Sequence, residues 1–124
     1  MILLNKYFEI LSRKEIDNLS AEYDIALLPK CDVYEGHFPG NPVCPGVCNI
    51  ECIKECVMMF KRQSLRYSTI KLCRFTALAT PGNCARLKVE FKLTPSDSGY
   101  AIQSSISDEN QTYLVVKGQL DIIQ

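Results

Sequence analysis

Hydrophobic and polar residues alternate along most of this chain, and one long apolar stretch lies near its middle. Within residues 22–28, Tyr23, Ile25 and Leu27 alternate with polar or small neighbours, a period of two that is typical of a half-buried strand. The same period recurs in four later segments, residues 70–72, 87–93, 100–102 and 114–116. Turn-forming residues separate these segments, so the pattern predicts four further strands in succession.

The beginning of the chain has a weaker pattern. Residues 3–11 are rich in aromatic and aliphatic side chains that favour strands, and they predict one there. Ser12 and Glu15 have the spacing of a helical capping box. We therefore expect a short turn of helix within residues 12–19, between the first two strands.

The apolar stretch, residues 47–62, contains no glycine or proline. It follows Pro45, which suits the first turn of a helix, and it predicts a helix of roughly four turns. Because this helix is apolar on most sides, we expect it to be buried. Two strands, one buried helix and four strands indicate an α+β fold for residues 1–124, a single domain whose antiparallel sheet curls around the helix.

Composition limits the cellular context. The 124 residues are 47% hydrophobic, enough for a core. No apolar run approaches the ~20 residues of a membrane-spanning helix, and residues 1–4 are too short an apolar start for a signal peptide. Seven cysteines without such a signal indicate reduced thiols. We expect a cytoplasmic protein that does not bind membranes.

The net charge is zero, which argues against nucleic-acid binding, but the charges are unevenly distributed. Residues 56–89 contain no acidic side chain, and their basic residues are Lys61, Arg62, Arg66, Lys71, Arg74, Arg86 and Lys88. Two interpretations remain open: a solvated face beside the sheet, or a docking surface for an anionic partner.

Three features suggest acid–base chemistry. His37, the only histidine, lies in a loop rich in glycine and proline and is a candidate base, although it is equally compatible with a packed or exposed side chain. Glu51 lies in the apolar stretch, where burial would leave it a proton to donate; alternatively it faces solvent with Lys54 and Glu55. The first amides of the helix, at Gly46 and Val47, can hold a developing oxyanion or belong to an ordinary helix start.

Cysteines recur every four residues at positions 44, 48, 52 and 56. On a helix the outer two would be about 18 Å apart, too far to bind one metal ion. We expect these side chains to pack as small hydrophobic groups. Neither a metal nor another cofactor is expected.

One stretch of the sequence carries a resemblance to a known family. The residues concerned are His37-Phe38-Pro39-Gly40-Asn41-Pro42-Val43, Pro45-Gly46-Val47 and Glu51. In this order and spacing they resemble the signature of the hot-dog-fold β-hydroxyacyl-acyl-carrier-protein dehydratases of fatty acid synthesis. The resemblance implies a hot-dog fold, in which a curled antiparallel sheet wraps around one central helix.

The resemblance also implies a reaction. In that family the active site lies at a dimer interface, where the histidine of one subunit faces the helix carboxylate of the other. By this correspondence His37 removes the C2 proton of a 3-hydroxyacyl thioester and Glu51 protonates the departing hydroxyl, while the Gly46 amide holds the thioester carbonyl. The product is a trans-2-enoyl thioester, and the protein is a homodimer or a higher even oligomer.

The same resemblance implies where the substrate and its carrier bind. The acyl chain would lie in an apolar tunnel beside the helix, with Phe38, Val43, Val47 and Glu55 as substrate-binding residues. An acyl carrier protein bearing a phosphopantetheine thioester would dock on Lys61, Arg62, Arg66, Lys71 and Arg74. A related branch that also isomerises its product has aspartate at position 51, so Glu51 favours the plain dehydratase.

Several positions depart from the family pattern. Cys44 replaces a methionine, Asn49 an apolar residue and Glu55 a glutamine, and the usual N-terminal helix is absent, which indicates a divergent member. Glu51 and Glu55 either repel each other across one helical turn, or Glu55 reaches water or Lys54. Two other functions remain open: a hot-dog acyl thioesterase, and a non-catalytic subunit that binds acyl carriers.

Overall fold

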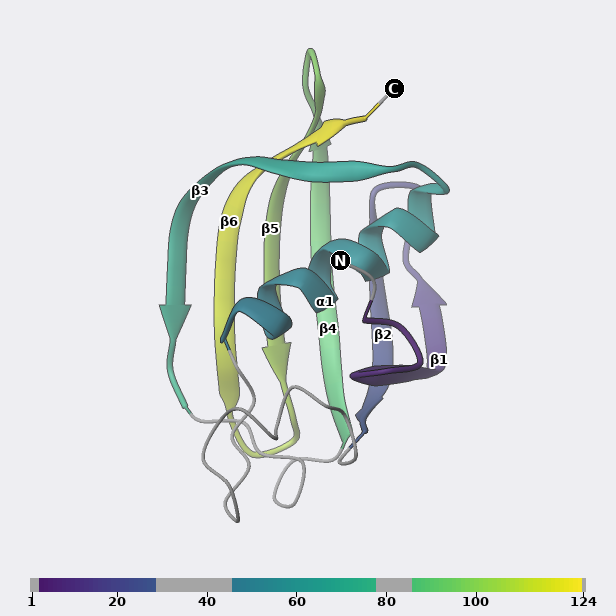
Figure 1. Cartoon of the computed structure of the whole chain (residues 1–124), viewed down its shortest axis with the longest axis vertical. Helices are drawn as coiled ribbons and strands as arrows, with labels where there is room; N and C mark the ends of the chain where they lie inside the picture. Colours follow the sequence, from purple (N-terminus) through teal and green to yellow (C-terminus); the bar gives the residue numbers. More distant parts are fainter. Residues whose placement is uncertain (1–2, 29–45, 78–85, 124) are drawn as a thin grey trace.

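The structure, a computed structural model, describes residues 3–28, 46–77 and 86–123. In chain order its elements are β1 (Phe8–Glu15), β2 (Ser20–Leu27), α1 (Gly46–Lys61), β3 (Leu65–Phe75), β4 (Arg86–Pro95), β5 (Gly99–Ser107) and β6 (Thr112–Ile122). The strands form one antiparallel sheet in the order β1-β2-β4-β5-β6-β3. The sheet curls around α1 (Figure 1), as the sequence pattern predicted.

Strand β3 provides much of this curvature. It runs across the top of the view in Figure 1 and then bends downward at the edge of the sheet, and it is paired with β6 from Leu65 to Phe75. Its pairing with β6 shifts register twice, between Tyr67 and Thr69 and between Ile70 and Leu72. Such irregularities bend a strand and increase its local twist, so β3 can follow the helix while it remains paired with the sheet.

The helix and the later strands were predicted well, and the start of the chain was not. The helix α1 differs from the predicted segment by one residue at each end. Residues 3–7 form a turn rather than a strand, with Asn5 in the left-handed region at φ 66°. Ser12 lies within β1 and donates its hydroxyl to Asp24 of β2. Cross-strand pairing therefore outweighs the local capping signal.

The core lies between the helix and the concave face of the sheet. Alternate residues of β2, among them Tyr23 and Ile25, are buried against the helix side. The helix contributes Cys48, Cys52 and Cys56, all buried, which confirms that these cysteines pack as small hydrophobic groups. Cys44 lies outside the described residues. Within the described part of the chain, no helix is long and apolar enough to cross a membrane.

Candidate active site at helix α1

Part of the predicted site lies outside the described residues, namely His37, Phe38 and Val43. The residues predicted on the helix are described, and they lie along its first three turns: Gly46, Val47, Glu51 and Glu55. The roles of all seven residues stay predictions, and the geometry below concerns the helix residues and their neighbours.

Helix α1 begins at Gly46, and the ring of Phe75 packs directly against this glycine. A Cβ atom at position 46 would lie 2.5 Å from Cζ of Phe75, closer than van der Waals contact allows. Phe75 is the last residue of β3 and remains 53% exposed. The first-turn amides, which lack acceptors within a helix, therefore lie beside an exposed aromatic ring. Val47, which follows, is 66% exposed.

The sequence left open whether Glu51 is buried or faces solvent beside Lys54. In the structure it is both largely buried and paired with Lys54. Its side chain is only 13% exposed, and its Oε1 lies 2.9 Å from Nζ of Lys54, one turn along the helix. Burying a carboxylate is costly unless it is paired, and Lys54 supplies the opposite charge. The ion pair fixes the direction of the carboxylate within the face that α1 turns away from the sheet.

Tyr67 of β3 contacts the helical turn that carries Glu51, and the sequence did not predict this contact. Its hydroxyl donates a hydrogen bond of 3.0 Å to the carbonyl of Ile50. Burial, and then the negative charge of Glu51, raise the pKa of Tyr67, so its hydroxyl stays protonated near neutral pH. Tyr67 thereby ties β3 to the helical turn that carries Glu51.

Glu55 is buried and bound by backbone amides. Its Oε1 and Oε2 accept hydrogen bonds from the Leu3 amide at 2.8 and 2.9 Å, and Oε1 also accepts from the Leu4 amide at 3.0 Å. Hydrogen bonds to an ionised acceptor are among the stronger ones in proteins. This differs from both arrangements considered for Glu55, because Lys54 pairs with Glu51 instead.

Asn49, the other polar departure on the helix, also contacts the start of the chain. Its Oδ1 accepts a hydrogen bond of 2.6 Å from the hydroxyl of Tyr7, and both side chains are buried. Asn49 and Glu55 therefore fasten the turn of residues 3–7 to the helix at two points. The sequence placed neither contact, since their partners are more than forty positions away.

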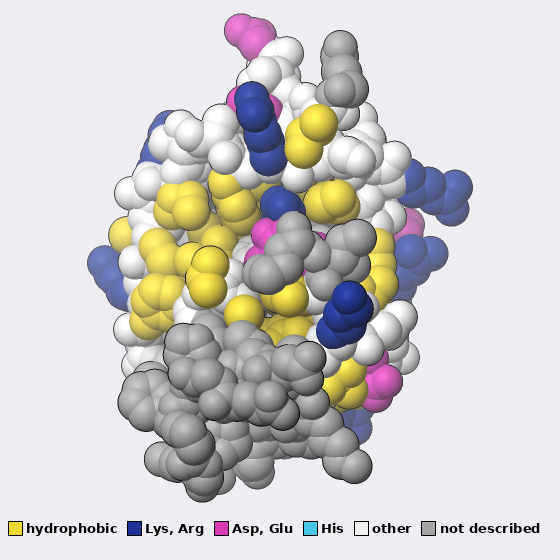
Figure 2. Space-filling model, viewed as in Figure 1, with side chains coloured by type: hydrophobic (Ala, Val, Ile, Leu, Met, Phe, Trp, Pro, Cys, Tyr) yellow, Lys and Arg dark blue, Asp and Glu magenta, His cyan; other side chains and the backbone are white. Residues whose placement is uncertain are grey.

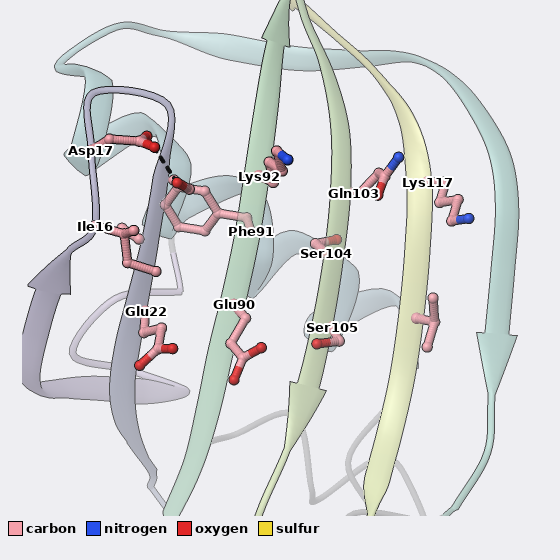
Figure 3. A pocket seen from close by; sticks show the side chains of 13 residues that line it. Ile16, Asp17, Glu22, Glu90, Phe91, Lys92, Gln103, Ser104, Ser105 and Lys117 are labelled. Atoms are coloured by element: carbon pink, nitrogen blue, oxygen red, sulfur yellow. Dashed lines mark hydrogen bonds between the residues drawn. The ribbon is translucent and has the colours of Figure 1, made fainter.

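A pocket of about 650 Å³ borders the same helix face. It is lined by Leu4, Glu51, Lys54, Glu55, Met58, Met59, Arg62, Gln63, Ser64, Leu65 and Ile123. A second pocket, of about 560 Å³, lies on the face of the sheet turned away from α1 (Figure 3). Polar side chains such as Glu90, Gln103 and Lys117 line that second pocket. Of the predicted catalytic residues that the structure describes, Glu51 lines the helix-side pocket and none lines the second pocket, so the helix-side pocket is the relevant one of the two.

The predicted docking residues extend from the end of the helix along β3. Arg62, Arg66, Lys71 and Arg74 are exposed, whereas Lys61 is half-buried and donates to the backbone carbonyl of Asn18 at 3.0 Å. Apolar side chains gather on the face formed by α1 and β3 (Figure 2). The exposed ones among them include Val47, Ile70 and Phe75.

Comparison with known proteins gives concordant results. Residues 12–117 match the model of a family described as ApeI-like, ApeI dehydratase. The chain is 26% identical over 121 residues to the 3-hydroxyacyl-acyl-carrier-protein dehydratase FabZ of Lactiplantibacillus plantarum, covering 88% of this chain and 82% of the relative. For the FabZ of Legionella pneumophila the identity is 31% over 101 residues, with 71% and 67% covered.

Solved structures share the fold. A chain of the dehydratase heterocomplex ApeI:P from Xenorhabdus doucetiae superposes with a TM-score of 0.77 at 23% identity, covering 90% of this chain and 96% of that one. An uncharacterised protein from Erwinia carotovora subsp. atroseptica gives a TM-score of 0.65 at 19% identity, covering 92% and 94%. The curled sheet around one helix is therefore the hot-dog fold.

Proposed function

Since the chain belongs to the ApeI-like dehydratase family, we propose that it dehydrates 3-hydroxyacyl thioesters, carried by an acyl carrier protein, to trans-2-enoyl thioesters. The observation that carries this proposal is the arrangement on α1. A largely buried, ion-paired Glu51 lies about one and a half turns after the helix start at Gly46, so its residue position is only about 8 Å along the helix axis from the first-turn amides.

Each residue has a defined part in the proposed reaction. His37 accepts the C2 proton, and the electrons of that C–H bond form the double bond to C3. The C3–O bond breaks, and the hydroxyl leaves as water with a proton from Glu51, which must therefore be protonated rather than ion-paired with Lys54 when the substrate is bound. The Gly46 amide donates to the thioester oxygen, which becomes more negative as the C2 proton leaves. Phe38, Val43 and Val47 line the path of the acyl chain.

The proposal includes a second copy of the chain. In the described part of the sheet, β3 is an edge strand that carries exposed Ile70 and Phe75. The Phe75 ring packs against Gly46, the neighbour in sequence of exposed Val47. Exposed apolar patches of this kind mark interaction sites. A homodimer, or a larger even oligomer, would cover this face and bring His37 of one subunit to Glu51 of the other.

The proposal also includes an acyl carrier protein as the partner and the cytoplasm as the compartment. Four exposed cations at the helix end and along β3, Arg62, Arg66, Lys71 and Arg74, complement an acidic carrier protein. Lys61 was predicted with them, and its ammonium is already hydrogen-bonded to Asn18. Cys56 and Cys73 are free thiols, which suits a reducing cytoplasm.

Turnover of defined substrates tests the proposal. Wild-type protein is incubated with 3-hydroxyacyl thioesters of acyl carrier protein and of coenzyme A, and the products are identified by mass spectrometry and chromatography. We expect loss of one water to give the trans-2-enoyl thioester, with rates lowered about a hundredfold or more in His37→Ala and Glu51→Gln. Glu90→Gln, the same chemical change on the outer sheet face (Figure 3), serves as the control.

Three outcomes contradict the proposal. Equal rates in wild type, His37→Ala and Glu51→Gln would show that these residues do not carry the reaction. Release of free thiol without an enoyl product would show a thioesterase instead, and tight binding of the enoyl thioester without turnover would show a non-catalytic subunit.

A further inference from the structure

We propose that Lys54 is a positioning residue for the general acid: it pairs with the carboxylate that forms when Glu51 gives up its proton, and it thereby sets the pH range of the reaction. This inference rests on the proposed function, in which Glu51 is the acid. From the sequence, Lys54 was considered only as a solvent-exposed neighbour of Glu51.

The ion pair between Lys54 and Glu51 is largely shielded from water. Nζ of Lys54 lies 2.9 Å from Oε1 of Glu51, and the two side chains are only 16% and 13% exposed. They are three positions apart on α1, a spacing at which side chains meet on a helix. Because the attraction between opposite charges grows as water is excluded, this pair should influence the Glu51 proton more than an exposed pair would.

The other charged residues that line the pocket have different partners or positions. The carboxylate of Glu55, next to Lys54 in the chain, accepts hydrogen bonds from two backbone amides of the turn that precedes β1. Arg62 is exposed and follows the end of α1, about three turns beyond Glu51. Of the described cations that line this pocket, Lys54 is therefore the one in contact with the acid.

Other elements add uncharged neighbours to the ion pair. From β3, the Tyr67 hydroxyl reaches the helical turn that carries Glu51. Burial, and then the charge of Glu51, raise the pKa of Tyr67, so this hydroxyl is neutral near pH 7. From the turn that precedes β1, the apolar Leu4 lines the same pocket. These neighbours exclude water without compensating the Glu51 charge, which leaves that task to Lys54.

The ion pair acts when the proton is transferred. With substrate bound, Glu51 carries a proton and is uncharged. As this proton passes to the departing hydroxyl, a carboxylate forms within reach of the Lys54 ammonium. Their attraction offsets the free energy of creating a negative charge in a largely buried place. Lys54 therefore makes Glu51 a readier proton donor.

The same attraction has the opposite effect on the resting enzyme. It favours the carboxylate before the reaction, so a smaller fraction of the enzyme carries the required proton as the pH rises. After each turnover His37 releases the C2 proton to solvent and Glu51 takes one up, so the protons balance. Lys54 should therefore speed the proton transfer and confine dehydration to lower pH.

Rate profiles against pH measure both effects. The kcat and kcat/KM for dehydration of a 3-hydroxyacyl thioester are determined for wild type, Lys54→Met and Lys54→Arg, over the pH range in which circular dichroism shows folded protein. In Lys54→Met the fall in rate at alkaline pH should move up by about half a pH unit, and the maximal kcat should drop about twofold. Lys54→Arg keeps the charge and should restore both.

Lys88→Met provides the matched control. Lys88 pairs with Glu22 at 3.8 Å, and Glu22 lines the pocket on the outer face of the sheet, so the same substitution removes an ion pair away from the site. This variant should keep the wild-type pH profile and kcat. A merely structural role for Lys54 would lower the free energy of unfolding and leave the pH profile unchanged.

A titration that needs no turnover tests the ion pair by itself. Protein labelled with ¹³C at the glutamate side-chain carboxyl groups is followed by NMR as the pH is lowered, and the Glu51 signal is assigned from its absence in Glu51→Gln. In Lys54→Met, Glu51 should take up its proton at a pH about half a unit higher than in the wild type. In Lys54→Arg and Lys88→Met it should do so close to the wild-type pH.

The outcomes separate this inference from the proposed function. If Glu51 titrates identically in wild type and Lys54→Met, or if the pH profile does not move, the inference is overturned even where turnover is observed. A raised KM with unchanged kcat and pH profile would show that Lys54 binds the substrate directly, which also overturns it. If the Glu51 titration shifts as expected but the wild type dehydrates no 3-hydroxyacyl thioester, the influence of Lys54 on the Glu51 proton is supported and the dehydratase proposal fails.

Discussion

Gly46 illustrates how a single side chain constrains the start of the helix. The Phe75 ring occupies the space that a Cβ atom at position 46 would need. Because the ring is half-exposed, it can move aside at modest cost to stability. Its movement would nevertheless rebuild the surface beside the first-turn amides, where the thioester carbonyl is proposed to bind.

A double-mutant cycle measures this contact. Alanine is favoured over glycine by about 1 kcal/mol in helix interiors and by less at the first helical position, so Gly46→Ala should stabilise a Phe75→Ala protein by no more than a few tenths of a kcal/mol. In the wild-type background the displaced ring should offset most of that gain. Urea denaturation of the four proteins gives the coupling free energy. A coupling of zero would show that Phe75 does not restrict position 46.

The residue scale also shows where sequence reasoning reached its limit. Glu51 was identified from a carboxylate in an apolar stretch, a signal that local sequence carries. The roles of Asn49 and Glu55 were not identified, because their partners Tyr7 and Leu3 come into contact only once the chain has folded. Both were read as departures from the family pattern, and both fasten the turn of residues 3–7.

At the scale of elements, hydrophobic periodicity predicted the helix and the four strands that bury alternate residues, β2, β4, β5 and β6. Of β3, which is mostly exposed, only residues 70–72 were predicted. Strand β1 was misplaced because most of its residues are exposed, so no alternation marks it. It exists through its pairing with β2. The bend of β3 was not predicted either, since the register shifts depend on its partner β6.

Three aspartates in or beside the turns between strands lead us to predict that the free energy of unfolding decreases at acid pH. Hydrogen bonds lower the pKa of three aspartates: Asp17, chiefly through the Leu19 amide; Asp108, through the Tyr113 hydroxyl; and Asp121, through the Ser98 hydroxyl. A lowered folded-state pKa contributes stability that is present above the ordinary value of 3.8 and is lost as the pH falls through the folded-state value.

Urea denaturation as a function of pH checks this expectation. The free energy of unfolding of the wild type should fall as the pH drops below 3.8. A triple variant with Asp17→Asn, Asp108→Asn and Asp121→Asn should be less stable at neutral pH and should show a shallower fall. If the free energy of unfolding falls equally steeply with pH in the two proteins, these three aspartates are not the cause of the fall.

At the scale of the whole molecule the net charge is zero, but residues 56–89 contain basic side chains and no acidic ones. The exposed residues Arg62 and Arg66 are proposed to meet an acidic carrier protein. Arg62→Glu combined with Arg66→Glu should weaken carrier binding about tenfold or more at low salt, and less at high salt. Calorimetric titration at two salt concentrations measures this, with Lys117→Glu on the outer face as control. Unchanged affinity for the carrier would indicate that Arg62 and Arg66 lie on a solvated face and do not bind it.

The most direct test joins two inactive variants. In a shared site, His37 and Glu51 come from different subunits, so a dimer of one His37→Ala and one Glu51→Gln subunit retains one intact site. Unfolding and refolding an equimolar mixture should restore dehydration of a 3-hydroxyacyl thioester to about a quarter of the wild-type rate. Wild type treated identically serves as the control and should remain active. If the mixture is as inactive as either variant alone, the result contradicts a dehydratase site shared between two subunits.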